Sequence, residues 1–263
     1  MRLKGLILFA VVIAAVYGAY VRTHNHSQNA AKNSGAASSS SASSASSKGF
    51  DKHKYSINDS ASLWVVVNKA RVLPSNYAPA DLVVPNVPLR DAPGSEEMHL
   101  RAEAGTALEN LVSEATKSGI KLRLSSGYRS YANQQSLYAG YVAQSGREAA
   151  DASSARPGHS EHQTGLAADL SPTNGVCDIQ QCFDATPEGK WLAANAYKSG
   201  FIIRYRQGTQ SVVGYQYEPW HVRFLGTDLA ARIQQSGKTV EEFFGLPPAP
   251  VYPVSSYELK LGR

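Results

Sequence analysis

The sequence predicts a single α+β domain with a central, mainly antiparallel sheet flanked by helices, preceded by an N-terminal apolar segment and a disordered linker. Helical and strand-like patterns of apolar residues are interspersed between residues 55 and 247. They do not follow the regular strand–helix–strand alternation of a parallel sheet, and no internal repeat is visible. With 43% hydrophobic residues in a chain of 263, one substantial core can be built.

The first 54 residues are predicted to lie outside this domain. Arg2 and Lys4 precede an uncharged stretch at 5–21, which is typical of an export segment. Within residues 1–23 it serves either as a membrane anchor with its start inside the cell or as a cleaved signal peptide. Residues 24–54 are rich in Ser and Ala and lack apolar bulk, so a flexible linker is expected. The protein should therefore act outside the cytoplasm, anchored in the membrane or secreted to the cell wall.

The domain itself begins with a β-rich stretch at 62–73, followed by a proline-rich irregular stretch at 74–93. Residues 100–118 carry apolar side chains at helical spacing, and Gly119 suits the C-terminal cap of that helix. Residues 120–124 alternate apolar and charged side chains, which indicates a strand with one buried face.

The remaining predicted elements continue this mixture of helices and strands. In chain order they are a helix at 132–144 with Leu137, Tyr141 and Val142 inward, a strand containing 166–170, a short helix at 191–199 ended by Gly200, strands at 201–205 and 217–224, a helical turn at 239–244 and a C-terminal tail at 248–263.

Cys177 and Cys182 are the only cysteines of the chain. In an exported protein, two cysteines so close together normally form a small-loop disulfide. A metal-binding pair is the alternative, but no second Cys or His pair follows at zinc-finger spacing.

The formal net charge is +5, with Lys and Arg scattered along the chain. Neither a basic helix nor an array of aromatic and basic residues is present, so nucleic-acid binding is not expected. A polyanionic surface such as a cell wall fits this charge better.

His162 and Asp169 stand out as candidate metal ligands. On one α-helix a spacing of seven residues would separate them by roughly 10 Å along the axis, too far for a shared metal ion. Pro157 and Gly165 disfavour a helix, and Gly165 permits a chain reversal. A loop residue and a residue of the following strand can therefore face one point.

Glu218 and His221 form a second candidate pair. Pro219 excludes a helix interior here, and in a regular strand a separation of three residues puts the two side chains on opposite faces. A shared site needs a local irregularity of the strand. A hydrolytic zinc site requires three protein ligands and a nearby carboxylate base, and His162, Asp169, Glu218 and His221 meet that count. The residues alone leave open which carboxylate binds the metal.

Three segments carry a resemblance to a known family: SSGYRSYANQQ at 125–135, GHSEHQTGLAADL at 158–170 and YEPWHVRF at 217–224. In this order and spacing they resemble the zinc D-alanyl-D-alanine carboxypeptidases of the VanY type. These belong to a larger group with LD-carboxypeptidases, VanX-type dipeptidases and phage endolysins. The resemblance extends over residues 62–247.

This resemblance implies a role for each matching residue. His162, Asp169 and His221 would bind Zn²⁺, and Glu218 would act as the general base for the attacking water. Arg129 would stabilise the substrate carbonyl oxygen as negative charge develops.

Ser160 and Gln134 match positions that hold the C-terminal carboxylate of the substrate in related enzymes. His159 is not expected to be a ligand, because it lies three residues from His162. Glu161 is expected to be solvated. Trp220 is expected beside the site, as a core aromatic or as a substrate contact.

The function implied is a monomeric, exported, zinc-dependent D-alanyl-D-alanine carboxypeptidase that removes the terminal D-Ala from peptidoglycan stem peptides. One alternative is an LD-carboxypeptidase acting on tetrapeptide stems with the same site. A second is a non-catalytic, zinc-containing module that binds the cell wall.

Overall fold

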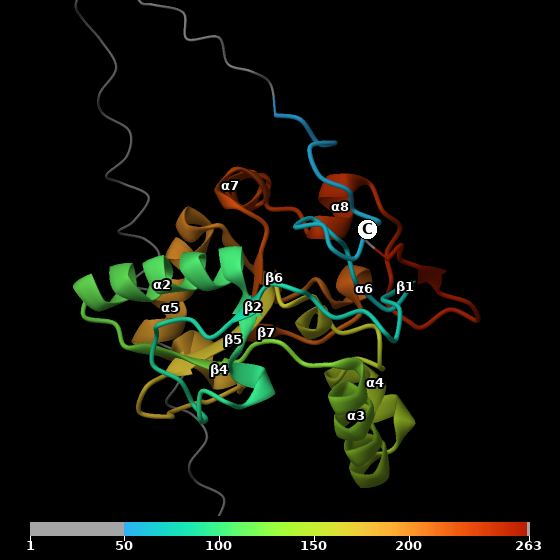
Figure 1. Ribbon diagram of the computed structural model, residues 1–263, viewed down its shortest axis with the longest axis horizontal. Coiled ribbons are helices and arrows are strands. Elements are labelled where there is room, and N and C mark those ends of the chain that lie inside the picture. The colour runs from blue at the N-terminus through green and yellow to red at the C-terminus, as the bar shows by residue number, and fades with distance from the viewer. Residues whose placement is uncertain (1–49, 262–263) are drawn as a thin grey trace, which may run out of the picture. The chain divides into compact units, whose positions relative to one another are not determined.

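The computed structural model of the protein describes residues 50–261 (Figure 1). The expected export segment at 1–23 lies outside the described residues, as does the expected linker up to residue 49. Within the described part of the chain, no helix has both the length and the apolar character needed to cross a bilayer.

The central sheet has four strands in the order β4-β5-β7-β6, and every neighbouring pair is antiparallel. The strands are β4 (Leu122–Ser126), β5 (Ala167–Pro172), β6 (Phe201–Tyr205) and β7 (Glu218–Phe224). The predicted α+β class with an antiparallel sheet is confirmed.

Alternation along β5 and β7 gives the sheet two different faces. Ala168 and Val222 belong to the hydrophobic core, whereas Asp169 and His221 are the adjacent residues on the opposite face. All four side chains are buried, so the polar face is covered as well.

Helices α2 (Ala102–Lys117), α5 (Pro187–Asn195) and α7 (Thr227–Ser236) supply apolar side chains to the core that includes Val222. The helix predicted at 100–118 is confirmed as α2, and Gly119 follows its end with φ of +76°. Helix α7 was not predicted from the sequence, although its buried residues Leu229, Ala230 and Ile233 follow helical spacing.

Helix α3 (Tyr131–Ser145) packs against α4 (Arg147–Ser153) at the periphery of the domain, away from α2 (Figure 1). The predicted helix at 132–144 is therefore confirmed. Its predicted inward face is right only in part: Leu137 and Val142 are half-buried, but Tyr141 is 39% exposed, and the fully buried side chain of α3 is Gln134. The sequence reading did not identify α4.

The segments around the core form short elements. They are β1 (Arg71–Val72), β2 (Leu82–Val83), η1 (Glu96–Met98), β3 (Leu100–Arg101), η2 (Glu161–Thr164), η3 (Gln181–Ala185), η4 (Ala196–Ser199), α6 (Gln210–Val213), α8 (Val240–Phe244) and β8 (Tyr257–Glu258). Of the β-rich stretch predicted at 62–73, only β1 forms a strand. Residues 65–67 are buried as core loop instead.

Beyond α8, the chain runs back to contact residues 58–72 near the start of the described part. Strand β8 pairs in parallel with β1, and the backbone N–H groups of Leu259 and Lys260 donate to the carbonyl oxygens of Val72 and Asn58. On the polar side of the sheet, Arg223 of β7 donates to the carbonyl oxygens of Leu63 and Val65, and Arg204 of β6 donates to Glu241 of α8.

Candidate metal centre and active site

Three site residues lie side by side across the sheet. In the register of β4, β5 and β7, Ser126 is paired with Asp169, and Asp169 is paired with His221. Directly opposed residues on antiparallel strands have Cβ atoms about 5 Å apart and point to the same face. The pairing of β5 with β7 therefore brings together residues that are 52 positions apart in the sequence.

His162 reaches the same point from η2. The Ser160 hydroxyl caps this short helix by accepting a hydrogen bond from the His162 N–H at 3.3 Å. Gly165 ends it with φ of +66°, in the left-handed region that favours glycine. The chain then reverses into β5, so the seven-residue spacing between His162 and Asp169 is bridged by a non-helical path.

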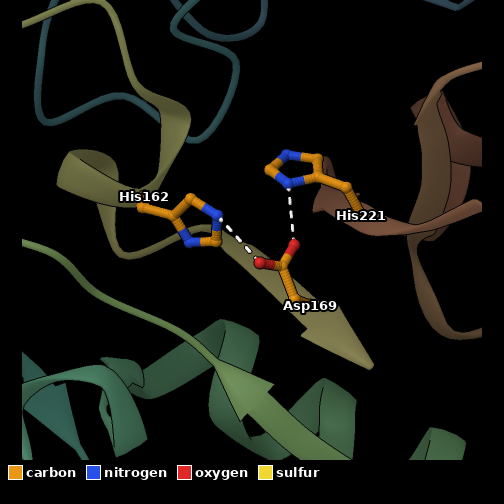
Figure 2. Close-up of side chains that lie close together, drawn as sticks. All are labelled: His162, Asp169 and His221. Carbon is orange, nitrogen blue, oxygen red and sulfur yellow. Dashed lines mark hydrogen bonds and ion pairs between the residues drawn. The ribbon is translucent and has the colours of Figure 1, made fainter. Parts of the chain in front are cut away.

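The ligand atoms of His162, Asp169 and His221 converge (Figure 2). His162 Nε2 lies 3.3 Å from Asp169 Oδ2, and His221 Nδ1 lies 3.0 Å from Asp169 Oδ1. One ligand atom from each residue lies within 4.8 Å of the others. Tetrahedral zinc with bonds of about 2.1 Å separates its ligand atoms by about 3.4 Å, so these residues fit the ion.

The remaining nitrogen of His162 is fixed by the backbone. His162 Nδ1 lies 2.6 Å from the carbonyl oxygen of Gly127, which can only accept, so the ring carries its proton there. Nε2 is thereby left with a free electron pair facing Asp169. Burial is the main cause that lowers the pKa of His162, which favours the neutral form that metals bind.

The other two ligand candidates form a charged pair in the absence of metal. Burial opposes ionisation of Asp169, but contacts with His162 and His221 outweigh it and hold the pKa of this carboxyl well below its usual range. Burial likewise opposes protonation of His221, but hydrogen bonds with Asp169 and Glu161 raise its pKa to about 10. A bound cation would replace the proton at this position.

Glu218 stands beside this group because β7 is irregular. The pairing of β6 with β7 runs from Ile203 with Val222 to Tyr205 with Glu218, so β7 contains two more residues than β6 in this interval. Glu218 Oε2 consequently lies 3.9 Å from His221 Nδ1, on the same side of the strand. Burial raises the pKa of Glu218 to about 8, with a further contribution from the charge of Asp169 and opposition from His221.

Arg129 is held by three acceptors. Its guanidinium donates to Glu97 Oε1 at 2.7 Å, to Ser126 Oγ at 2.8 Å and to Gln134 Oε1 at 3.1 Å. A guanidinium fixed in this way can stabilise a developing negative charge without first changing its own conformation.

Gln134 and Ser160 line the same cavity but are engaged in protein contacts. The Gln134 amide donates to the backbone oxygen of Ala155 at 2.7 Å while its oxygen receives Arg129. Both side chains are buried. Within the protein alone, their bonds position Arg129 and the η2 turn.

The cavity has a volume of about 270 Å³. Its wall contains all seven of the predicted catalytic, substrate-binding and metal-binding residues, namely Arg129, Gln134, Ser160, His162, Asp169, Glu218 and His221. Leu137, predicted as an inward residue of its helix, also lines the wall, and further wall residues that were not predicted from the sequence are Glu97, Ser126, Ile179 and Tyr205. Of these four, only Ser126 could have been found from the sequence, because it lies inside the motif SSGYRSYANQQ at 125–135.

Glu161, His159 and Trp220 are the neighbours of the site for which an expectation was drawn from the sequence. The expectation that Glu161 is solvated is wrong, because its side chain is 1% exposed and pairs with Arg204 and Arg223. His159 lies outside the converging group: its Nδ1 is 2.9 Å from the Asn68 carbonyl oxygen. Trp220 belongs both to the core and to the cavity wall.

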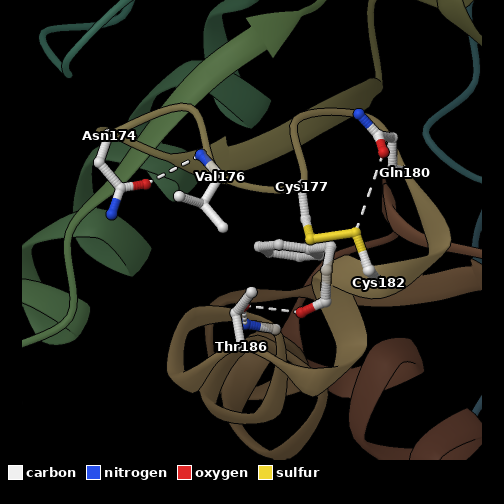
Figure 3. Close-up of a disulfide and its surroundings, with 8 residues drawn as sticks. Asn174, Val176, Cys177, Gln180, Cys182 and Thr186 are labelled. Carbon is white, nitrogen blue, oxygen red and sulfur yellow. Dashed lines mark hydrogen bonds between the residues drawn. A yellow bond between two sulfur atoms is a disulfide. The ribbon is translucent and has the colours of Figure 1, made fainter.

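Cys177 and Cys182 form a disulfide (Figure 3). The loop that it closes carries Ile179 to the cavity wall. Asp178 in the same loop accepts hydrogen bonds from Arg123 and Ser125, both at 3.0 Å. The disulfide thus closes a loop that is attached to β4 and borders the cavity.

Comparison with known proteins agrees with this geometry. The family profile of VanY, described as D-alanyl-D-alanine carboxypeptidase, matches residues 97–227. The carboxypeptidase-family protein YodJ of Bacillus subtilis is 40% identical over 189 residues, which are 72% of this chain and 69% of YodJ.

Two solved structures show the same fold. The LdcB LD-carboxypeptidase superimposes with a TM-score of 0.68 at 38% identity, covering 76% of this chain and 89% of that chain. A variant of the VanY D,D-pentapeptidase in complex with Zn(II) gives a TM-score of 0.55 at 29% identity, covering 68% and 97% respectively. The chain is therefore a carboxypeptidase that belongs to the VanY family.

Proposed function

We propose that this protein is a zinc-dependent carboxypeptidase that removes the C-terminal D-alanine from peptidoglycan stem peptides. The observation that carries the proposal is the convergence of His162, Asp169 and His221 beside Glu218, in the wall of a cavity that also contains Arg129. Zn(II) in the VanY structure and the D-alanyl-D-alanine specificity in the family's description support the metal and the substrate class.

His162, Asp169 and His221 hold the ion. Zinc bound there would acidify a water molecule and polarise the peptide carbonyl. Glu218 lies beside His221 in the cavity wall. A carboxyl with a raised pKa can take a proton from the attacking water and return it to the leaving amine.

Arg129 donates to the substrate carbonyl oxygen as that oxygen gains negative charge. Ser160 and Gln134 lie next to it in the cavity wall and bind the free carboxylate of the terminal residue. A substrate must therefore end in a free carboxylate, which makes the enzyme remove a single C-terminal residue.

A second version of this activity differs only in the residue that precedes the terminal D-Ala. The likeness to the LdcB LD-carboxypeptidase, at 38% identity, exceeds the likeness to the VanY D,D-pentapeptidase, at 29%. This difference favours tetrapeptide stems, in which an L-configured centre precedes the scissile bond, over pentapeptides that end in D-Ala-D-Ala.

We place the enzyme outside the cytoplasm, as a monomer held at the membrane by its N-terminal segment or released to the cell wall. The disulfide between Cys177 and Cys182 supports an oxidising compartment.

The test is turnover by the zinc-loaded full chain of two peptides, a pentapeptide stem ending in D-Ala-D-Ala and a tetrapeptide stem ending in D-Ala. Free D-alanine should appear with at least one of them and vanish on addition of a chelator. The ratio of the two kcat/KM values assigns DD or LD specificity. If neither peptide is cleaved although the protein binds zinc and sediments with cell walls, the non-catalytic wall-binding alternative replaces this proposal.

Glu218→Ala should retain zinc and lose turnover. The matched control is Glu103→Gln, which alters an exposed carboxylate on α2 that is not part of the cavity wall and should leave turnover unchanged. Full activity of the Glu218 variant would contradict the assignment of the base.

A further inference from the structure

A buried cluster of four charged side chains lies behind the metal-binding group. Glu161, Arg204, Arg223 and Glu241 are each 2% exposed or less. Arg204 donates to Glu241 through two nitrogens, at 2.6 Å and 3.0 Å, and to Glu161 at 2.9 Å. The formal charges of the cluster sum to zero. The reaction proposed above assigns no role to any of the four.

The two arginines bind the Glu161 carboxylate on one side only. Arg204 Nε and Arg223 Nη1 both donate to Oε1, each at 2.9 Å. The second oxygen, Oε2, receives neither arginine and instead faces Nε2 of His221 at 3.5 Å, the outer limit of a hydrogen bond. The arginines thus fix the carboxylate while leaving one oxygen directed at His221.

His221 presents its two nitrogens to different partners. Nδ1 faces Asp169 at 3.0 Å, on the side where the candidate ligand atoms converge, and Nε2 faces Glu161. A neutral imidazole binds metal through the nitrogen without a proton, so coordination by Nδ1 requires the proton on Nε2. An ionised carboxylate is an acceptor only, and Glu161 Oε2 favours that tautomer.

The plane of the ring is restrained separately. Tyr205 stacks on His221 with ring centroids 4.8 Å apart and an interplanar angle of 29°. Stacking resists tilting of the ring but does not distinguish its two nitrogens. The acceptor at Nε2 is the contact that can keep the ring proton on that nitrogen and leave Nδ1 free to bind a metal.

We propose that Glu161 is the positioning residue of the metal centre: held by Arg204 and Arg223, it fixes the tautomer and orientation in which His221 offers Nδ1 to zinc. The inference rests on the proposed zinc site. Partners of this kind raise the basicity of a ligating histidine, and their removal typically weakens metal binding by about 10- to 100-fold.

The test compares zinc affinity in the full chain with Glu161→Gln and Glu241→Gln, using competition with a chromophoric chelator. Both variants remove one carboxylate charge from the same buried cluster, but only Glu161 contacts His221. Glu161→Gln should weaken zinc binding by about 10- to 100-fold. Glu241→Gln should change it by less than about threefold, even where unfolding of the metal-free protein shows a comparable loss of stability.

Unchanged affinity in Glu161→Gln, or equal weakening in both variants, would overturn the inference, since the cluster would then act on folding alone. If the wild type itself does not bind zinc, the proposed function fails instead.

A second measurement does not depend on the folding of any variant. Nitrogen-15 NMR of the zinc-loaded wild type should show His221 with metal on Nδ1 and a hydrogen-bonded proton on Nε2. Metal on Nε2, with the proton on Nδ1, would refute the role of Glu161.

Discussion

The buried carboxyl of Glu218 links the chemistry of the site to the stability of the metal-free protein. Burial raises its pKa from 4.5 to about 8. Because the folded-state pKa lies above the unfolded one, the folded state binds this proton more tightly. Stability from Glu218 is fully present below the unfolded pKa and is lost as the pH rises toward the folded pKa. We therefore expect the metal-free protein to lose stability between about pH 4 and about pH 8 because of this one group.

The size of the loss follows from the shift. With about 1.4 kcal/mol per pKa unit, the raised pKa of Glu218 lowers the free energy of unfolding by about 1 kcal/mol at pH 5 and by about 4 kcal/mol at pH 8, relative to pH values below the unfolded-state pKa. Glu218→Gln keeps the size of the side chain and removes its titration. The metal-free variant should thus be more stable than the metal-free wild type, by a margin that grows with pH.

Urea unfolding of the full chain in excess chelator, followed by tryptophan fluorescence from pH 5 to pH 8, measures this margin. Subtraction of the two curves cancels the groups that both proteins share, and Glu103→Gln should run parallel to the wild type. A margin for Glu218→Gln that does not change with pH would refute the reasoning. The same variant, loaded with zinc, should be inactive.

Three further variants probe other contacts of the site. Arg129→Lys replaces a guanidinium that meets three acceptors, and should lower kcat by about 10²- to 10³-fold while zinc affinity is unchanged. Gly127→Ala would drive a Cβ atom into the carbonyl oxygen of His99 and should cost about 2 kcal/mol or more in thermal unfolding. Replacing both Cys177 and Cys182 by Ser should cost about 2 kcal/mol through loop entropy and raise KM, because the loop borders the cavity.

Each of these outcomes can fail on its own. Equal loss of zinc and turnover in the Arg129 variant would mean that the arginine supports the fold of the centre rather than the substrate. A Gly127 variant as stable as the wild type would show that the loop can move aside. A disulfide variant with normal KM would show that the loop holds its position without the covalent bond.

Much of the scaffold was predictable because its signals are local. Helical spacing of apolar residues identified α2, and alternation identified β4. The same rules put Leu137, Tyr141 and Val142 on the inward face of α3, but Leu137 and Val142 are only half-buried and Tyr141 is exposed, because α3 packs on α4 and Gln134 is its one fully buried side chain. Amphipathic spacing predicts that a helix has an apolar face. Only the tertiary packing determines whether another element covers that face.

The candidate site divides in the same way. The sequence by itself determined that His162 and Asp169 need a bent path, because seven residues of helix would separate them too far and Gly165 allows a reversal. It also showed that Glu218 and His221 could share a site only through an irregular strand. Whether that irregularity exists depends on how β7 pairs with β6, which lies elsewhere in the chain.

Only the tertiary structure decided the environment of Glu161. A glutamate between two histidines in a polar loop has the local signature of a solvated residue. It is buried because Arg204 and Arg223, 43 and 62 positions away, meet it on the side of the sheet where His221 lies. A buried charge is stable only where a partner of opposite charge compensates it. Here the partners are far away in the sequence, and their positions follow no helical or strand periodicity that could be recognised. The sequence thus indicated which residues could bind a metal, whereas only the fold determined that His221 turns Nδ1 toward Asp169 and Nε2 toward Glu161.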